Sequence, residues 1–502
     1  MNSRTLVAPL VLCLVSAPAI RAQQDAGMDG PAPLGTTARE PDSQAQAVAD
    51  SNVQEDPTST HSLFKALTFE EDWGGLSTQA GQIESEHIAP EMKYIDLAEG
   101  WTASVGGDFR FQYRSEDNKA LTGPRNGNND FYLFRERVHG EVRYRDDVRF
   151  YLELLNAGIA SNDLPPAATD RNNVEVQNAF VELLGEDAKI RFGRTELAYG
   201  SQRLIGVNNW ANTRQTFEGA VATLENGDGE LTTDLFVVKP VLVAPRDGDE
   251  HDGSRYLAGV YNTWHIDPER NFDFYGLLVN EDDDVLAGGS GAVGNGELYT
   301  VGARYAAKHE HLDYEVEAAR QFGNLADSSV RAGMWSAVGG YTVDTMDCRP
   351  RLALDVDYAS GDSNPTDNKS ETFNQLFPSS HLYFGYLDLI GRQNIISVMP
   401  NVSCQVNDEI GLRLSYADFH LANKHDSLYA ADGTATFTDP TGANGNNVGN
   451  EIDATVSFRP ELLAPHSTFL VGYSTFSPDR EVDGLGNGDR AHMIYAQYTF
   501  AF

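Results

Sequence analysis

Alternation of apolar and polar residues is the feature that most constrains what this chain can fold into. The last ten residues, MIYAQYTFAF, place Ile494, Tyr498 and Phe502 on one face of an extended strand, with Gln497 and Thr499 on the other. A final strand rich in aromatic residues is typical of a bacterial outer-membrane β-barrel, whose lipid face is apolar and whose lumen face can be wet. The pattern therefore predicts both a compartment and a fold class.

The N-terminal residues are typical of a secretory signal peptide, which we expect to comprise residues 1–22. Arg4 precedes an apolar stretch, Leu6–Ile20, that is too short to span a bilayer, and cleavage is expected after Ala19 or Ala22. No later segment approaches the roughly 20 consecutive apolar residues of a membrane helix. Because only helices and closed barrels satisfy every backbone polar group in lipid, the chain is expected to cross the membrane through strands.

The region after the signal peptide is acidic and differs from the rest of the chain. Residues 23–95 begin with a stretch rich in Ala, Pro, Ser, Gln and carboxylates, so we expect a mostly disordered periplasmic segment. Its last part, from about residue 61, is expected to form short irregular structure below a barrel of residues 96–502. The chain has 74 acidic and 37 basic residues, a formal net charge of −37, which argues against nucleic acid as a partner.

Extended segments of suitable length recur through residues 103–502. About 18 candidates have close to the 9–11 residues that a tilted membrane strand needs. They are 103–114, 130–145, 147–156, 174–184, 188–194, 214–224, 231–239, 255–264, 271–279, 298–306, 311–321, 333–343, 349–358, 395–403, 409–420, 449–458, 467–476 and 490–502. Short connections, such as 145–147 and 185–187, alternate with long ones, such as 195–213, 280–297 and 421–448. Short periplasmic turns and long extracellular loops produce this alternation, so the sequence predicts an all-β fold, a transmembrane antiparallel β-barrel.

Charged residues in the early strands share one face, and apolar residues share the other. Phe109 opposes Arg110 in the first strand, and Val138 opposes Arg135 and Arg137 in the second. Because Lys or Arg on the lipid face near the midplane costs about 2–4 kcal/mol, the charged faces are expected to point into the lumen. Over the first five strands this inward charge is mainly basic.

The later strands carry more acidic inward residues. Asp313 and Glu315 share one face, as do Arg351 and Asp355. In one interpretation, these charges neutralise the basic ones and brace the wall. In the other, the two walls form a constriction whose transverse field orients a charged solute, with the basic wall attracting anions.

Two long motifs carry more specific information than the strand pattern. They are FGRTELAYGSQRLIGVNNWANTRQTFEG, residues 192–219, and GDSNPTDNKSETFNQLFPSSHLYFGYLDLIGRQN, residues 361–394. Both resemble motifs of the alginate export porin family, and residues 92–114 resemble that family's first barrel segment. The resemblance covers about residues 92–502. It implies an 18-stranded barrel with an electropositive constriction through which chains of uronate diffuse.

Candidate pore residues come from this resemblance and from strand parity. The first motif implies a pore-facing loop and anchoring ion pairs made by Arg194, Glu196, Arg203, Trp210, Arg214 and Glu218. With the residues chosen by parity, the predicted pore-lining set is Arg110, Arg135, Arg137, Arg143, Lys189, Arg191, Arg194, Arg203, Arg214, Glu196, Glu218, Arg351 and Asp355.

The predicted function is that of an outer-membrane porin for anionic solutes, with an acidic uronate-type oligosaccharide or polysaccharide such as alginate diffusing past an arginine-rich wall. Alternatives are a general or other-substrate porin with a transverse charge field and, less favoured, a surface adhesin that uses loops 359–394 and 421–448. The aromatic residues of 359–394 make that loop apolar enough to fold into the lumen. Expected partners are outer-membrane lipid and an anionic carbohydrate or other small anionic solute. The sequence leaves open whether a periplasmic secretion component is also a partner.

Enzymatic activity and a cofactor are not expected. The sequence contains no recognisable nucleophile elbow, HExxH or P-loop. Structural calcium has weak candidates in two acidic clusters, Asp247 with Asp249 and Asp282 with Asp284, although neither has EF-hand spacing.

Two cysteines fall close together in the predicted topology. Cys348 precedes the thirteenth strand candidate and Cys404 follows the fourteenth, so antiparallel pairing brings both to the periplasmic rim. Neighbouring strands lie about 5 Å apart, which suits a disulfide, and the periplasm is oxidising. A disulfide is therefore predicted, unless a slip in register separates the two residues.

Overall fold

An antiparallel β-barrel accounts for most of the chain in the computed structural model. The structure describes residues 64–71, 92–119, 127–287, 293–364, 366–460, 466–479 and 489–502, and of 283–287 it describes the backbone alone. The predicted signal peptide, 1–22, lies outside these residues, as does most of the predicted acidic segment, 23–95. No helix in the described ranges is long and apolar enough to cross a membrane.

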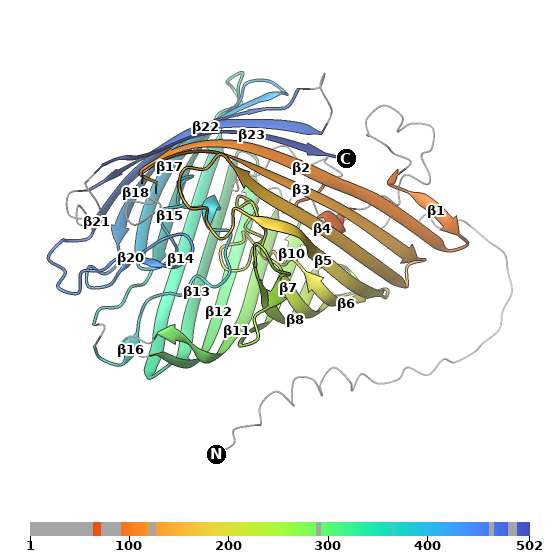
Figure 1. Cartoon of the computed structure of the whole chain (residues 1–502), viewed down its shortest axis with the longest axis horizontal. Helices are drawn as coiled ribbons and strands as arrows, with labels where there is room; N and C mark the ends of the chain where they lie inside the picture. The colour runs from red at the N-terminus through yellow and green to blue at the C-terminus, as the bar shows by residue number, and fades with distance from the viewer. Residues whose placement is uncertain are drawn as a thin grey trace, which may run out of the picture. The chain divides into compact units, whose positions relative to one another are not determined.

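Eighteen long strands within the described residues form a closed ring (Figure 1). They are β2 (Trp101–Asp117), β3 (Asn128–Tyr144), β4 (Val148–Ala160), β5 (Asn172–Leu184), β6 (Ala188–Thr195), β7 (Phe217–Glu225), β8 (Leu231–Leu242), β10 (Arg255–Asp267), β11 (Arg270–Ala287), β12 (Val293–His309), β13 (Leu312–Leu325), β14 (Ser328–Thr342), β15 (Arg351–Ala359), β17 (Ile395–Gln405), β18 (Ile410–Leu421), β21 (Asn447–Phe458), β22 (Ser467–Pro478) and β23 (Ala491–Ala501). Neighbours in the ring are antiparallel, and β23 closes it by pairing with β2 from Asp108↔Ala501 to Asp117↔His492. The predicted 18-stranded barrel is confirmed.

Connections on one side of the barrel are longer than those on the other, as expected, with two differences. The predicted long loop 280–297 is wrong, because β11 continues to Ala287 and β12 begins at Val293. On the same side, only Ala326 and Asp327 join β13 to β14. These strands are longer than a membrane crossing requires, and beyond the hydrocarbon their outward side chains need not be apolar.

Side-chain exposure follows the predicted parity. Along β4, Phe150 and Leu152 are 45% and 48% exposed, whereas Tyr151 and Glu153 are 4% and 0% exposed. The outward face is thus apolar and the inward face is polar and covered, which is the reverse of a water-soluble domain. This arrangement suits a barrel whose outer surface contacts lipid.

Two connections fold into the barrel and meet there. We call residues 196–216, between β6 and β7, inner loop 1, and residues 360–394, between β15 and β17, inner loop 2. Inner loop 2 includes β16 (Lys369–Ser370) and the 3-10 helix η5 (Ser380–Leu382). Ile205 forms a parallel bridge with Phe377, and the Phe377 N–H donates to the Leu204 carbonyl at 2.9 Å.

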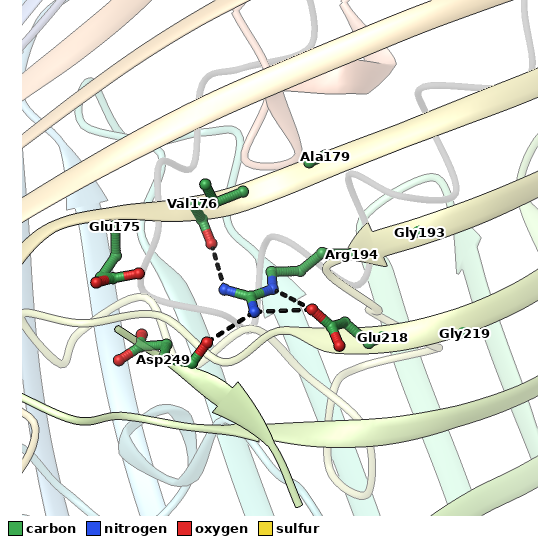
Figure 2. A pocket seen from close by; sticks show the side chains of 8 residues that line it. All are labelled: Glu175, Val176, Ala179, Gly193, Arg194, Glu218, Gly219 and Asp249. Atoms are coloured by element: carbon green, nitrogen blue, oxygen red, sulfur yellow. Dashed lines mark hydrogen bonds and ion pairs between the residues drawn. The ribbon is translucent and has the colours of Figure 1, made fainter. Parts of the chain in front are cut away.

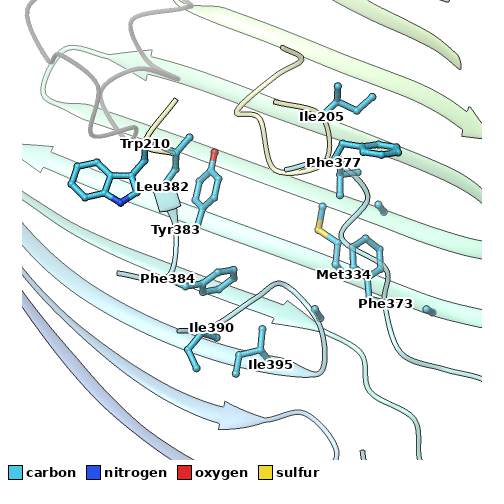
Figure 3. Close-up of a cluster of buried hydrophobic side chains, with 14 of the residues drawn as sticks. Ile205, Trp210, Met334, Phe373, Phe377, Leu382, Tyr383, Phe384, Ile390 and Ile395 are labelled. Carbon is cyan, nitrogen blue, oxygen red and sulfur yellow. The ribbon is translucent and has the colours of Figure 1, made fainter. Parts of the chain in front are cut away.

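Aromatic burial explains why inner loop 2 lies inside the barrel. Phe373 is 0% exposed and Phe384 is 2% exposed, within an apolar cluster that also contains Ile205 and Tyr383 (Figure 3). Burying such rings is favourable by roughly 1.5–3 kcal/mol each. The prediction that this loop folds into the lumen is confirmed.

Shorter strands pair beside the ring or apart from it, and a disulfide joins a turn to the end of a strand. β1 (Ile95–Ala98) pairs with β2, β9 (Glu250–His251) pairs with β8, and β19 (Leu428–Tyr429) pairs with β20 (Ala435–Phe437) in the connection between β18 and β21. On the side of the short turns, Cys348 and Cys404 form a disulfide with their Cα atoms 5.4 Å apart. The predicted disulfide is confirmed.

The described residues 64–71 lie against the inner wall of the barrel, where we expected irregular structure below it. They include the 3-10 helix η2 (Thr68–Glu70). The ring of Phe69 packs against Tyr151 of β4 and Phe180 of β5, both of which are buried. The aromatic character of this segment was visible in the sequence, but the surface that receives it was not.

Candidate functional site

Inner loop 1 crosses the lumen. Arg110 on β2 donates to the carbonyls of Asn209 and Ala211, whereas Arg304 on β12 donates to Ser201 Oγ at 3.0 Å. β2 and β12 are nine steps apart in the ring of eighteen, so they lie on opposite walls. The loop therefore reaches from one wall to the other and narrows the lumen.

Near the start of inner loop 1, the backbone comes close to β10, and a glycine allows this approach. Gly200 has a φ of 52°, and a Cβ at this position would lie 2.6 Å from Tyr261 Oη on β10. Beside it, the ring of Tyr199 stacks on Tyr261 with centroids 4.7 Å apart and on Phe236 with centroids 5.3 Å apart. The Tyr-Gly pair of the sequence motif thus fastens the start of inner loop 1 to the wall.

Guanidinium groups from the wall hold residues 209–211 of inner loop 1, which we call the basic end. Arg110 Nη1 donates to the Asn209 carbonyl at 2.6 Å, and Arg135 Nη2 donates to Asn209 Oδ1 at 2.8 Å. Arg110 and Arg135 are 3% and 2% exposed. The Arg114 guanidinium lies over the ring of Trp210 at 4.5 Å. Three inward arginines therefore converge on one turn of the loop.

A buried ion pair joins the residues where inner loop 1 leaves and rejoins the wall. Arg214 Nε donates to Glu196 Oε1 at 2.5 Å, and both side chains are 0% exposed. Gln177 Nε2 on β5 donates to the same carboxylate oxygen at 2.9 Å. Removing one partner of such a pair leaves a buried charge uncompensated, so the pair fixes where the loop leaves and rejoins the wall.

The part of inner loop 1 around Arg203, which we call the acidic end, is held by carboxylates of the wall. Arg203 of the loop pairs with Glu315 and, at 3.1 Å, with Glu317, both on β13. Arg304 bridges Asp273 at 2.8 Å and Glu315 at 2.6 Å. Burial alone would lower the pKa of Arg203, but Glu315 beside it raises that pKa well above its ordinary value. The guanidinium is therefore always charged.

Inner loop 2 supplies a second guanidinium to the same region. Arg392 pairs with Asp357 of β15 and lies over the ring of Phe384 at 4.8 Å. The ring of Tyr383 is contacted by two guanidinium groups, Arg203 at 4.6 Å and Arg392 at 4.9 Å. Burial raises the pKa of Tyr383 above its usual value, so its hydroxyl stays neutral.

An aromatic contact joins the two inner loops to each other and to the wall. The rings of Trp210 and His381 stack with centroids 4.0 Å apart, and His381 Nδ1 lies 2.8 Å from Asp388 Oδ1. Burial raises the pKa of Asp388, but the contact with His381 outweighs that effect and holds the pKa below its usual value. Tyr386 stacks on Tyr495 of β23 at 5.3 Å. The lumen is thus crossed by one connected unit.

Family membership follows from a comparison of the sequence with family models. The model described as alginate export matches residues 102–493, which is most of the chain. The chain belongs to the alginate export family. This membership confirms the resemblance seen in the two motifs and, with the barrel fold, indicates a transporter of the bacterial outer membrane rather than an enzyme.

Solved structures of porins share the fold at low sequence identity. OccAB1 of Acinetobacter baumannii has a TM-score of 0.57 and 12% identity, with 80% of this chain and 97% of that chain covered. A BenF-like porin from Pseudomonas fluorescens Pf-5 has a TM-score of 0.56 and 10% identity, covering 80% and 98%. OccK11 (OpdR) of Pseudomonas aeruginosa has a TM-score of 0.51 and 12% identity, covering 82% and 100%. No match to a curated protein is found.

Other predicted pore-lining residues of this alginate export family member lie along the wall beside carboxylates. The pairs are Arg137 with Asp108 at 2.6 Å, Arg143 with Glu141 at 2.9 Å, Arg191 with Glu182 at 2.8 Å and Arg351 with Asp313 at 2.9 Å. Asp355 accepts from Asn401 Nδ2 at 3.3 Å, and Lys189 shares a face of β6 with Arg191. In each of the four pairs, a carboxylate of the wall faces the guanidinium group.

Arg194 and Glu218 lie away from the inner loops. Arg194 shares a face of β6 with the exposed residue Phe192, and it donates to Glu218 at 2.7 Å and to the Asp249 carbonyl at 2.9 Å. These groups line a pocket of about 490 Å³ at the ends of β6 and β7, together with Glu175 (Figure 2). The structure therefore does not bring these two predicted residues to the basic or acidic end.

The weak calcium candidates do not form a cluster in the described part of the chain. Asp249 accepts from Asn172 Nδ2 at 2.6 Å and from the Ala244 N–H at 2.7 Å. Asp282 lies within β11, and the side chain of Asp284 is outside the described residues. Among described residues, no group of three or more His, Cys, Asp or Glu is placed to hold a metal ion.

Several site residues were missed from the sequence. Arg304 lies on β12, where strand parity could have selected it, because it alternates with outward residues in the predicted strand 298–306. Arg392 and Tyr383 lie in the second motif, but neither carries a signal that separates it from its neighbours. Asn209 acts through its backbone carbonyl and amide, for which a sequence gives no cue.

Proposed function

We propose that this outer-membrane porin passes anionic solutes, and that these are acidic oligosaccharides or polysaccharides of the uronate type, such as alginate. The supporting observation is the basic end of inner loop 1. There, Arg110 and Arg135 reach from the wall into the lumen and donate to carbonyl and amide oxygens of the loop. The neighbouring Arg114 donates to the Trp210 carbonyl at 3.4 Å.

The chemistry of these contacts suits transient binding of a carboxylate. A guanidinium group binds carboxylate through two parallel hydrogen bonds, which are roughly twice as strong as bonds to a neutral oxygen. A solute carboxylate can therefore replace a loop carbonyl as the acceptor, and the carbonyl can replace it in turn. Such exchange satisfies the requirement that a solute binds well enough to enter the pore but weakly enough to leave.

A general porin with a transverse field is the second candidate, and one observation favours it. Glu451 and Asp453 of β21 are buried inward carboxylates that accept backbone N–H groups of inner loop 2, from Leu387 at 2.9 Å and Tyr386 at 3.4 Å. Carboxylates of β21 therefore face the lumen from a part of the wall that follows β13 in the ring. A field between this wall and the basic end would orient dipolar solutes without selecting uronates.

The discriminating experiment measures reversal potential in planar bilayers under a salt gradient, with an oligouronate or a neutral oligosaccharide added to one side. We expect anion preference and block by the oligouronate alone. In the double variant Arg110→Gln with Arg135→Gln, both should weaken, whereas Arg110→Lys with Arg135→Lys should keep most of the anion preference, because it keeps the charge.

The matched control is Arg349→Gln, in the turn between β14 and β15, where the arginine side chain is 67% exposed. This variant should behave like the unmodified protein. An unchanged reversal potential in the double Gln variant would show that the two arginines only brace inner loop 1. Equal block by neutral and acidic oligosaccharides would favour the general porin.

A further inference from the structure

Residues 64–71 lie against the inner wall of the barrel beside Arg191, one of the predicted pore-lining residues. Phe69 is 3% exposed, and its ring meets Phe180 edge-on at 5.5 Å. The guanidinium of Arg191 lies 4.2 Å from the centre of the Phe69 ring. η2, coloured orange-red, lies beside β4 in Figure 1. A side chain from outside the barrel sequence thus covers one of the predicted pore-lining arginines.

Backbone oxygens of the same segment engage two further arginines. Arg149 Nη2 on β4 donates to the Phe69 carbonyl at 2.6 Å, and Arg214 Nη2 of inner loop 1 donates to the Ala66 carbonyl at 3.0 Å. Thr68 Oγ1 lies 2.8 Å from Tyr151 Oη. The segment therefore bonds with both the wall and the base of inner loop 1.

A polar contact at one end of this segment and a ring contact at the other hold it in place. Glu71 lies 4.0 Å from Lys93 Nζ and 3.7 Å from His139 Nε2 on β3, and the Glu71 side chain is 3% exposed. Lys93 Nζ donates to the Phe502 carbonyl at 2.8 Å, and the ring of Phe64 lies 4.5 Å from that of His466. A buried carboxylate of the chain is thus already bound where the lumen wall carries cationic and imidazole groups.

We propose that residues 64–71 form a plug that occupies the path of anionic solutes and is displaced by them, an inference that rests on the proposed function. The plug offers Arg149 and Arg214 neutral carbonyl oxygens, and it offers Arg191 an aromatic face. Each of the three also pairs with a carboxylate of the chain, Glu141, Glu182 or Glu196, so the plug fills only their remaining donor positions. A polyuronate offers those positions a carboxylate, which is a stronger partner for a guanidinium than a carbonyl or a ring. A ligand that binds only the plug-free state shifts the population toward that state.

The ring of Phe69 is the anchor to remove, because it belongs to no barrel strand. In Phe69→Ala the single-channel conductance should rise severalfold and the noise should change, with heat-modifiable migration on gels unchanged. Thr68→Val, which removes the hydroxyl facing Tyr151, should have a smaller effect of the same sign. The matched control is Phe150→Ala, which removes a ring from the outward face of β4 and should leave conductance unchanged.

Displacement by solute is measured separately with an introduced cysteine, Leu67→Cys; the third native cysteine, Cys13, lies in the predicted signal peptide. Leu67 is 8% exposed in the docked segment, and the disulfide between Cys348 and Cys404 leaves neither of those sulfurs free to react. A water-soluble thiol reagent should label this cysteine slowly, and an oligouronate should accelerate labelling severalfold. A neutral oligosaccharide of equal length should not.

The outcomes separate the plug from the proposed function. Unchanged conductance in Phe69→Ala would overturn the plug, whatever the ion selectivity of the pore. Labelling of Leu67→Cys that ignores the oligouronate would overturn displacement by anions. A pore without anion preference, whose conductance nevertheless rises in Phe69→Ala and whose Leu67→Cys labelling still responds to oligouronate, would refute the proposed selectivity alone and support the plug.

Discussion

The two ends of inner loop 1 use arginine in opposite ways. At the acidic end the guanidinium group of Arg203 belongs to the loop, and the carboxylates of Glu315 and Glu317 belong to the wall. At the basic end Arg110 and Arg135 belong to the wall, and the loop supplies carbonyl and amide oxygens. The loop therefore contributes the charge at one end and uncharged oxygens at the other.

This difference assigns different roles to the two ends. Breaking a buried ion pair leaves a charge without a partner, which is strongly unfavourable, so the acidic end is expected to stay attached. A guanidinium held by neutral oxygens gains when a carboxylate replaces them, so the basic end can exchange partners with a solute. The acidic end is thus a fixed anchor, and the basic end is the side where selection is expected.

Glu315→Gln tests the fixed anchor and should have the largest effect. It removes the charge that Arg203 and Arg304 share, and we expect a loss of about 3–5 kcal/mol in the attachment of the loop. Thermal unfolding should begin at a lower temperature, and the current noise of the channel should increase. Glu310→Gln, in the exposed turn between β12 and β13, is the control. An equal effect of both variants would contradict the anchor.

Removal of the disulfide tests whether the stability of the barrel can be separated from transport. Cys348→Ser with Cys404→Ser should lower the free energy of unfolding by about 2–4 kcal/mol. The reversal potential should not change, because the bond joins the turn before β15 to the end of β17, on the side of the short turns. Thiol labelling of the denatured protein, before and after reduction, checks that the bond forms. A changed reversal potential would show that the turns influence the lumen.

Asn209→Ala probes the basic end from the loop side, with all wall charges retained. Asn209 Oδ1 accepts from Arg135 and Arg214, so its loss should weaken loop attachment by about 1.5–3 kcal/mol. Block by oligouronate should become stronger, because the amide no longer competes for Arg135. The control is Asn444→Ala in the exposed connection between β18 and β21. Weaker block would argue that Asn209 itself contacts the solute.

Glu218→Gln should have the smallest effect, because Glu218 lies on β7, outside both ends of inner loop 1. Its carboxylate pairs with Arg194 near the 490 Å³ pocket, and its side chain is 33% exposed. Such a solvent-accessible pair contributes at most about 1 kcal/mol. Stability should change by no more than that, and anion preference should not change. A shift in the reversal potential would place this pair on the solute path.

Local patterns sufficed for the strands but not for their partners in the lumen. Each of the 18 predicted strands overlaps one strand of the ring, because alternation is a property of neighbouring residues. The ends of β11 and β12 were missed, because outside the hydrocarbon the apolar face is no longer required. Parity also selected Arg110 and Arg135, but their acceptor Asn209 lies 99 and 74 residues away in the sequence.

The sequence by itself determined the barrel, its lipid face and the inward direction of its charges, since these follow from the period of a strand and the solvent on either side. The tertiary structure alone decided which arginine meets a carboxylate, which meets a carbonyl, and that Phe69 covers Arg191. Those partners are set by ring closure, which brings β2 opposite β12 and gives inner loop 1 two different walls to contact.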